Sequence, residues 1–147
     1  NAIMWYATQA RDAYPYYQHT AIGYNYRMPN INAALGCAQM ENLERYVENK
    51  RETAKKYHEF FSHFPEIEYF TEPADCRSNY WLNAIILKDR KAQQAFLEYT
   101  NDHGVMTRPV WELMNRLEMF KEYETDGLKN TKWLADRIVN IPSSVIK

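Results

Sequence analysis

Glycine and cysteine are both scarce in this chain of 147 residues. Its four glycines lie far apart, which excludes a glycine-rich phosphate-binding loop, because such a loop needs several glycines within a few residues. Two cysteines, Cys37 and Cys76, cannot form a disulfide framework. Cys37 lies in an apolar helical stretch, where a small buried thiol is expected. The cysteine usage therefore favours a reducing, cytoplasmic setting.

Excess charge and long apolar runs are missing as well. The net charge is -1, with 18 basic and 19 acidic residues spread along the chain. A basic patch typical of nucleic-acid-binding proteins is absent, so no nucleic-acid partner is expected. No uninterrupted apolar run approaches the roughly 20 residues that cross a bilayer, so no membrane association is expected.

The strongest pattern in the sequence covers residues 30–64, where apolar residues recur at steps of three, four or seven. This is the period of one helix face and predicts a long helix, straight or kinked. Residues 31–40 are small and apolar almost all round, which is typical of a helix buried on several sides, and Gly36 would let another backbone approach closely. From Glu41 onward, charged residues mark a solvent face. One end of the helix is therefore expected in a core or an interface.

Shorter patterns complete the predicted secondary structure. Residues 2–10 are helical in pattern, and a long irregular connection rich in tyrosine follows over residues 12–29. Beyond the long helix, the patterns predict strands at 67–70, 80–87, 105–108 and 139–141, helices at 90–103 and 128–137, and a short helical turn within 111–123. The strand, helix and strand over residues 80–108 form a β-α-β unit. The fold class is therefore α+β, with a sheet of three or four short strands covered by helices.

The loop from Gly23 to Arg27 concentrates groups that could bind a ligand. Asn25 can donate an amide hydrogen to an anionic oxygen, and Arg27 offers a planar fork for phosphate or carboxylate. Tyr24 and Tyr26 could wall a flat ring. Alternatively, the tyrosines simply pack the loop against the start of the helix. The residues alone favour this packing interpretation, since short polar motifs recur by chance.

A second candidate site lies where the strand at 105–108 ends in a loop, a usual place for ligand-binding groups. Arg108 could pair with a carboxylate or phosphate, and Trp111 could stack on a base or sugar. A structural arginine beside a core tryptophan is an equal alternative. The histidines follow no metal-ligand spacing and are expected to be solvated: they are His19, His58, His63 and His103.

Several motifs taken together resemble those of a known family. They are GYNYRM followed by NINAALGCAQMENL and KR-x-x-A-x-x-Y, with QARD at 9–12, YYQH at 16–19, TRPVW at 107–111 and LADRIVNIPSS near the end. Their order and spacing resemble the DegT/DnrJ/EryC1/StrS family. Members of that family are fold type I aminotransferases that use pyridoxal phosphate and aminate nucleotide-linked keto sugars. The resemblance covers most of the chain, but only the C-terminal part of the family's length.

The resemblance implies a division of the chain and a role for the first candidate loop. Residues 1–29 would be the tail of the large domain with a cofactor-proximal loop, and residues 30–147 the small C-terminal domain. Asn25 would reach across a homodimer to the phosphate of the partner's pyridoxal phosphate, with Arg27 beside it as a second cofactor-binding residue. The start of the long helix would lie at the dimer interface.

The resemblance also implies a substrate site. Tyr24, Arg108 and Trp111 would lie near a nucleotide-sugar substrate. After the TRPVW motif, many relatives continue with a Met-His pair and a proline, whereas this chain has Met114-Asn115 and Glu118 at those places. The identity of the sugar is therefore not implied.

The residue most needed for catalysis has no match in this sequence. A pyridoxal phosphate aminotransferase uses a lysine to hold the cofactor and to move a proton between substrate carbons. In the family this lysine lies upstream of the QARD-like stretch, and the lysines present stand in other contexts: Lys50, Lys55, Lys56, Lys88 and Lys91. No catalytic residue is therefore assigned, and the chain, which begins with asparagine, is expected to be a fragment that is inactive alone.

The expected whole enzyme transfers an amino group, with glutamate as donor, to a nucleotide-linked keto-deoxy sugar used for a surface polysaccharide. Two alternatives stay open. In a lysine-less relative the chemistry would be dehydration. In a different class of protein, the aromatic loop and the apolar helix would form a non-catalytic module that binds a protein partner.

Overall fold

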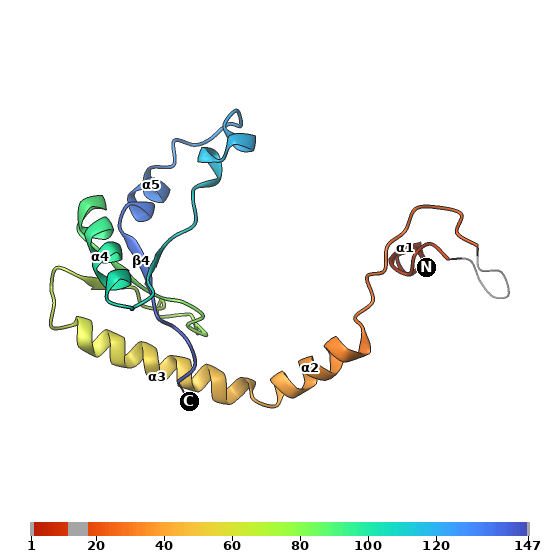
Figure 1. Ribbon diagram of the computed structural model, residues 1–147, viewed down its shortest axis with the longest axis horizontal. Helices are drawn as coiled ribbons and strands as arrows, with labels where there is room; N and C mark the ends of the chain where they lie inside the picture. Colours follow the sequence, from red (N-terminus) through yellow and green to blue (C-terminus); the bar gives the residue numbers. More distant parts are fainter. Residues whose placement is uncertain (1, 12–17, 147) are drawn as a thin grey trace. The chain divides into compact units, whose positions relative to one another are not determined.

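The computed structural model describes residues 2–11 and 18–146 (Figure 1). Residues 12–17, which include the start of the irregular connection and the first half of the YYQH motif, lie outside the described residues. The chain forms two compact units, Asn1–Leu43 and Glu44–Lys147. None of the helices in the described part of the chain is both long enough and apolar enough to cross a membrane.

The first unit begins with α1 (Ala2–Ala7), which ends earlier than the predicted helix over residues 2–10. Gln9 and Ala10 have φ angles of 70° and 48°, in the left-handed region, so they turn the chain away from the helix axis. The backbone N–H of Ala10 then donates to Trp5 O at 2.9 Å. Ala10 is fully buried by this turn.

The predicted long helix is in fact two helices, α2 (Asn30–Met40) and α3 (Leu43–Phe61). A turn at Glu41 and Asn42 separates them, and the Asn42 side chain donates from Nδ2 to Ala38 O at 3.0 Å. An asparagine side chain that bonds the backbone four residues back offers an alternative to the next helical turn. The break falls where the sequence changes from apolar to charged.

Within the described chain, α2 is exposed rather than buried. None of its residues is buried, and Ile31 and Leu35 keep 75% and 61% of their surface exposed. No atom lies within 4 Å of the position that a Cβ on Gly36 would take. Cys37 is exposed too, so the prediction of a buried thiol is wrong for this chain. The reason is that no described segment packs on this helix.

The second unit is built on a four-stranded antiparallel sheet in the order β1-β2-β4-β3. Its strands are β1 (Glu68–Tyr69), β2 (Asn83–Ile86), β3 (Arg108–Pro109) and β4 (Ile138–Ile141). Because β2 and β3 each pair antiparallel with β4, they run parallel to each other, and α4 (Arg90–Asp102) connects them. The predicted β-α-β unit is therefore confirmed, with β4 inserted between its two strands. The α+β fold class is confirmed as well.

One hydrophobic core holds this second unit together. Side chains from α3, the sheet and the segment after β2 form it: Ala54, Phe61, Tyr69, Ile85, Leu87, Val139 and Ile141. The inner face of α4 packs against this cluster through Ala92, Phe96 and Leu97, as its period predicted. Figure 1 shows α3 in yellow and α4 in green beside the sheet. A core shared by helices and strands fixes the strand ends that carry the candidate site.

The remaining elements have recognisable local causes. The side chain of Asp89 caps α4 by accepting from Ala92 N at 2.9 Å, and Gly104 follows the helix with a φ of 76°, as a C-terminal stop should. The predicted turn within 111–123 contains η1 (Met114–Arg116) and η2 (Glu118–Phe120), and α5 (Lys129–Ala135) precedes β4. The helical period of residues 128–137 predicts Trp133 to point inward, but its side chain is 47% exposed and lies under the Arg137 guanidinium.

Residues 142–146 run along α3 and are tied to it by polar contacts. Tyr57 Oη donates to Pro142 O at 3.0 Å, and Lys50 Nζ donates to Ser143 O. Asn49 makes two bonds with Ile146, accepting from its N–H at 2.8 Å and donating to its O at 3.0 Å. This segment, which we call the tail strap, therefore joins the end of β4 to the helix.

Candidate functional site

The Gly23 to Arg27 loop is held against α1 by backbone hydrogen bonds. Tyr24 N donates to Tyr6 O at 3.1 Å, and Tyr26 N donates to Ala7 O at 3.0 Å. A Cβ on Gly23 would lie 2.5 Å from Ala10 N, closer than real Cβ atoms come, so only glycine fits. The loop is thus docked by its backbone onto α1, and not by tyrosine packing onto the start of α2. Its side chains are left for other contacts.

Asn25 is exposed on this loop, and its side chain hydrogen-bonds the loop backbone. Its Oδ1 accepts from Arg27 N at 3.3 Å, and its backbone pairs with Thr8 in an isolated bridge. Because the oxygen of the amide faces the loop backbone, Nδ2 is the group presented outward, with no partner in the described part of the chain. An amide N–H donor of this kind suits an anionic oxygen, and the cofactor-binding role of Asn25 stays a prediction.

The tyrosines of the loop form an exposed aromatic pair. The rings of Tyr24 and Tyr26 stack with centroids 5.7 Å apart, and they are 60% and 75% exposed. Arg27 is exposed beside them, and the imidazole of His19 bonds Gln9 O through Nδ1 at 2.7 Å. An exposed pair of large rings next to an amide donor and a cation is a surface equipped for a ligand or a partner.

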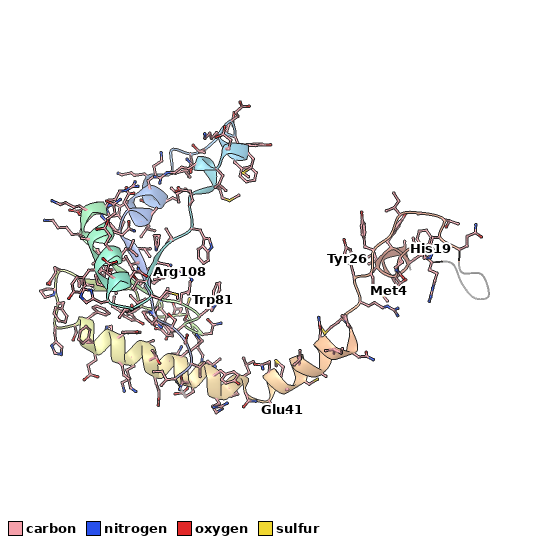
Figure 2. The ribbon with its side chains drawn as sticks, in the orientation of Figure 1. Met4, His19, Tyr26, Glu41, Trp81 and Arg108 are labelled. Atoms are coloured by element: carbon pink, nitrogen blue, oxygen red, sulfur yellow. The ribbon has the colours of Figure 1, made fainter. Side chains whose placement is uncertain are left out.

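The second candidate group lies at the end of the sheet in the other unit. Arg108 pairs with Asn140 across β3 and β4, and its side chain is exposed (Figure 2). Trp111 is 71% exposed and contacts Trp81, with ring centroids 6.4 Å apart. The alternative of a core tryptophan is therefore wrong. Both predicted side chains are open to a ligand.

Arg108 lines a hollow of about 520 Å³ that we call the Arg108 hollow. Its wall also includes Lys50 of α3, Trp81, Met106, Asn140 at the end of β4, and part of the tail strap. Lys50 Nζ donates to Ser143 O and to Trp81 O, the latter at 3.4 Å. The hollow thus combines two cations with an exposed aromatic ring.

Lys50 and Trp81 were not identified from the sequence, although both are now placed at this hollow. Trp81 was assigned to the strand predicted over residues 80–87, yet β2 begins only at Asn83. Tyr80 has a φ of 44°, which interrupts the extended backbone and leaves Trp81 65% exposed. In the sequence, Lys50 is one of many charged residues of the predicted long helix. Its place at the hollow depends on its hydrogen bond to the tail strap. No signal in the sequence marked this long-range contact.

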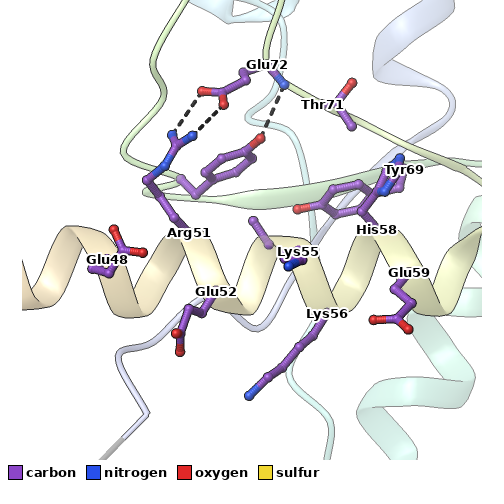
Figure 3. Close-up of a pocket in the computed structure, with 12 residues that line it drawn as sticks. Glu48, Arg51, Glu52, Lys55, Lys56, His58, Glu59, Tyr69, Thr71 and Glu72 are labelled. Carbon is purple, nitrogen blue, oxygen red and sulfur yellow. Dashed lines mark hydrogen bonds and ion pairs between the residues drawn. The ribbon is translucent and has the colours of Figure 1, made fainter.

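A larger hollow of about 910 Å³ lies between α3 and the segment after β1 (Figure 3). Arg51 clamps Glu72 with two bonds of 2.7 and 3.0 Å and donates to Ser78 O at 2.6 Å. The hydrogen bonds from Arg51 and from the Ser78 backbone lower the pKa of Glu72 to about 2. These paired charges attach the segment between β1 and Trp81 to α3. We therefore assign a structural role to this cluster.

Neither group of predicted site residues contains a metal centre. Among the described residues, no three histidine, cysteine, aspartate or glutamate side chains gather as a metal would need. The four histidines are exposed, as predicted. Tyr24, Asn25 and Arg27 lie together on one loop in the first unit. In the second unit Arg108 lines the Arg108 hollow, whereas Trp111 does not line it and contacts Trp81, which does.

Comparisons with known proteins agree with the motifs. The model of the DegT/DnrJ/EryC1/StrS aminotransferase family matches residues 3–145. EpsN of Bacillus subtilis (strain 168), named a pyridoxal phosphate-dependent aminotransferase, is 32% identical over 114 residues, covering 78% of this chain and 29% of EpsN. GDP-perosamine synthase of Escherichia coli O157:H7 is 31% identical over 128 residues, covering 86% of this chain and 34% of the synthase.

A solved structure matches the fold of almost the entire chain. Helicobacter pylori PseC, an aminotransferase involved in the biosynthesis of pseudoaminic acid, superposes with a TM-score of 0.84 at 16% identity. The match covers 97% of this chain and 40% of PseC. The chain spans about a third of the length of the curated relatives that it matches, at 29% and 34%.

Proposed function

Because the chain belongs to the DegT/DnrJ/EryC1/StrS aminotransferase family, we propose that it forms the C-terminal part of an enzyme that aminates a nucleotide-linked keto-deoxy sugar. The cofactor of this family is pyridoxal phosphate, as the sequence led us to expect. The observation that carries the proposal is the match of residues 3–145 to the family, together with a relative named GDP-perosamine synthase. The amino donor would be glutamate.

The length of the chain indicates which parts of the two domains of the enzyme it would form. Residues 1–29 would close the large domain, and residues 30–147 would form the small one. The lysine that holds the cofactor would belong to the large domain, because the family resemblance places it upstream of the QARD-like stretch. The chain alone would then be inactive, and the complete enzyme would work in the cytoplasm.

The first candidate loop fits a phosphate contact. Pyridoxal phosphate supplies an electron-withdrawing ring that carries the amino group between the two substrates. Asn25 would donate from Nδ2 to the phosphate of the cofactor in the partner subunit, and Arg27 would add a positive charge beside it. The bond from Arg27 N to Asn25 Oδ1 orients the amide for this contact. Tyr24 would face the substrate from the same loop.

The partner in the proposed assembly is a second copy of the enzyme. The start of α2 exposes Ile31 and Leu35 without a described segment to cover them. A contiguous exposed apolar face of this kind marks an interaction surface. A homodimer formed through this face would let the Asn25 loop reach a neighbouring active site.

The Asn25→Ala variant of the complete enzyme tests the cofactor contact. Loss of one hydrogen bond to a charged group should weaken pyridoxal phosphate binding by roughly tenfold, with the fold unchanged. Cofactor content would be measured from its absorbance after dialysis, with circular dichroism to check folding. Asn130→Ala, at an exposed asparagine of the second unit, is the matched control. Equal cofactor retention in the Asn25 variant and the parent would remove Asn25 from the cofactor site.

The sequence upstream of Asn1 separates the proposed function from the alternatives. A lysine there that carries the cofactor absorbance band supports amino transfer, and a histidine in its place supports the lysine-less dehydratase. A reading frame without any preceding cofactor domain would favour the non-catalytic binding module.

A further inference from the structure

A third hollow, of about 200 Å³, is lined by α4, by the loop that follows β3 and by the end of α5. We call it the α4 hollow. Its polar wall residues are Arg90, Gln93, Gln94, Glu112, Arg116 and Asp136. No described residue lines both this hollow and the Arg108 hollow. The α4 hollow is therefore a separate cavity of the second unit, with Trp111 as part of its wall.

One hydrogen-bond acceptor in this wall is unused. Gln93 is only 5% exposed, and its Nε2 donates to Ala135 O at 2.9 Å and to Ile138 O at 2.8 Å. These two carbonyl oxygens fix the orientation of the amide, because only its nitrogen can donate to them. The opposite atom, Oε1, receives no hydrogen bond from the described residues and is not fully enclosed. Oε1 is therefore available to an N–H donor from a ligand.

The charged groups of the wall are two cations and two anions, joined in loose pairs. Arg90 Nη1 donates to Asp136 Oδ1 at 3.4 Å, and Arg116 Nη1 donates to Glu112 Oε1 at 3.2 Å. Each pair makes a single bond, in contrast to the two-bond clamp on Glu72. A guanidinium has five N–H donors and a carboxylate two oxygens, so both pairs retain unused groups. Partly exposed pairs of this kind hold their partners weakly.

This set of groups matches a ligand that carries both charges. Equal numbers of cations and anions favour neither a plain anion nor a plain cation. In a zwitterion, a carboxylate can accept from the guanidinium groups while an ammonium, with three donors, serves the carboxylates and Gln93 Oε1. Leu97, Val110 and Leu113 add apolar wall for an aliphatic side chain.

The size of the hollow narrows the ligand further. Its volume of about 200 Å³ equals roughly seven water molecules, each with a share of about 30 Å³ in the liquid. Drug-sized ligands occupy sites of roughly 300–1,000 Å³. A nucleotide-linked sugar is therefore too large for this hollow, whereas a free amino acid of a few carbon atoms is not.

We propose that the α4 hollow binds a free α-amino acid with a small aliphatic side chain, its ammonium facing Gln93 Oε1 and the carboxylates and its carboxylate facing the two guanidinium groups. The bound amino acid ties α4 to the loop after β3 and to the end of α5, and so stabilises the second unit by mass action. This site goes beyond the proposed function, because no reaction takes place in it and neither the cofactor nor the nucleotide takes part. It couples the stability of this unit to the supply of free amino acids.

The test uses the complete enzyme with L-valine as the probe, and calorimetry and thermal melting as readouts. Valine should bind at one site per chain and raise the Tm of the parent. Arg116→Gln and Asp136→Asn should each raise the Kd for valine by roughly tenfold or more, because each removes one charge-assisted contact. Lys91→Gln removes an exposed cation of α4 outside the hollow, and as the matched control it should leave the Kd unchanged.

Two analogues of valine test the requirement for both charges. Isobutylamine lacks the carboxylate and isovalerate lacks the ammonium, and each should bind the parent at least tenfold more weakly than valine. An analogue that binds as well as valine would overturn the proposal, as would the absence of any heat or Tm change with valine.

The variants also separate this hollow from any other valine site. Valine that binds the parent, Arg116→Gln and Asp136→Asn equally well lies elsewhere, for example at the cofactor, and this result would overturn the proposal. Equal losses in Lys91→Gln would do the same. Thermal melting without ligand shows whether a variant has lost its fold, and Arg116→Lys, which keeps the charge, should recover part of the lost affinity.

Discussion

The two units of this chain treat their apolar residues in opposite ways. In the second unit, α3, α4 and the sheet close a core around Ile85 and Val139, both fully buried. In the described part of the first unit, Ala10 is the buried residue, while large side chains such as Ile31 and Leu35 stay exposed. The second unit therefore carries its own stabilising contacts, whereas the apolar surface of the first has no counterpart within the described chain.

This difference teaches that an apolar helix can mark an interface as well as a core. A helix without a clear polar face gains little from folding in water unless another surface covers it. The charged helix α3, by contrast, buries one face against the core and exposes its other faces to solvent. Substitutions of matched size in the two units can test whether the contrast is real.

The largest effect is expected for Ile85→Ala compared with Leu35→Ala. Removing buried methyl groups in the core should lower the free energy of unfolding of the second unit by about 2–5 kcal/mol. Leu35 is 61% exposed, so its truncation should leave that free energy unchanged and should instead weaken self-association of the complete enzyme. Denaturant titration and sedimentation would measure the two effects. A stability loss of equal size in both variants would end the distinction.

A smaller effect is expected for two glycines in the first unit. Gly23→Ala would place a Cβ 2.5 Å from Ala10 N, and such overpacking costs about 1–3 kcal/mol. The loop should then detach from α1, which hydrogen exchange at Tyr24 and Tyr26 would report. Gly36→Ala, with open space around it, is the control and should raise helix stability by roughly 1 kcal/mol. Similar protection in Gly23→Ala and the parent would show that the close approach is not required.

The smallest effect concerns the paired charges at Glu72 in the second unit. Its pKa is lowered from 4.5 to about 2, so the folded state favours the ionised form. The resulting stabilisation is fully present above pH 4.5 and is lost as the pH falls toward 2. Glu72→Gln should remove this part of the acid sensitivity, measured by denaturant titration from neutral pH downward. Glu52→Gln, at an exposed position on α3, serves as the control and should keep the slope of the parent.

Much of the second unit was predictable because its signals are local. The period of residues 90–103 and the glycine after them predicted α4 to within a residue at its end, and the cap by Asp89 was seen only in the structure. The strands were placed within a few residues, and the later start of β2 reflects the left-handed backbone of Tyr80. Such a conformation depends on the surrounding contacts and leaves no periodic signal.

The candidate site was only partly predictable. Arg108 and Trp111 were identified because they lie where a predicted strand ends in a loop. Lys50 and Trp81 line the same hollow as Arg108 through contacts that span long stretches of sequence. The roles of Asn25 and Arg27 came from the family resemblance and stay predictions. The burial of Cys37 was predicted wrongly because an apolar sequence does not reveal which molecule covers it.

The tail strap connects the rim of the Arg108 hollow to α3. Ser143 forms part of the rim, and its neighbours are fastened to α3 by paired bonds at Asn49 and a hydroxyl at Tyr57. Any occupant that pushes on this rim must strain those fastenings or tilt the helix with it. We therefore expect pressure on this rim to reach α3 at Asn49 and Tyr57, where the tail strap is bonded to the helix.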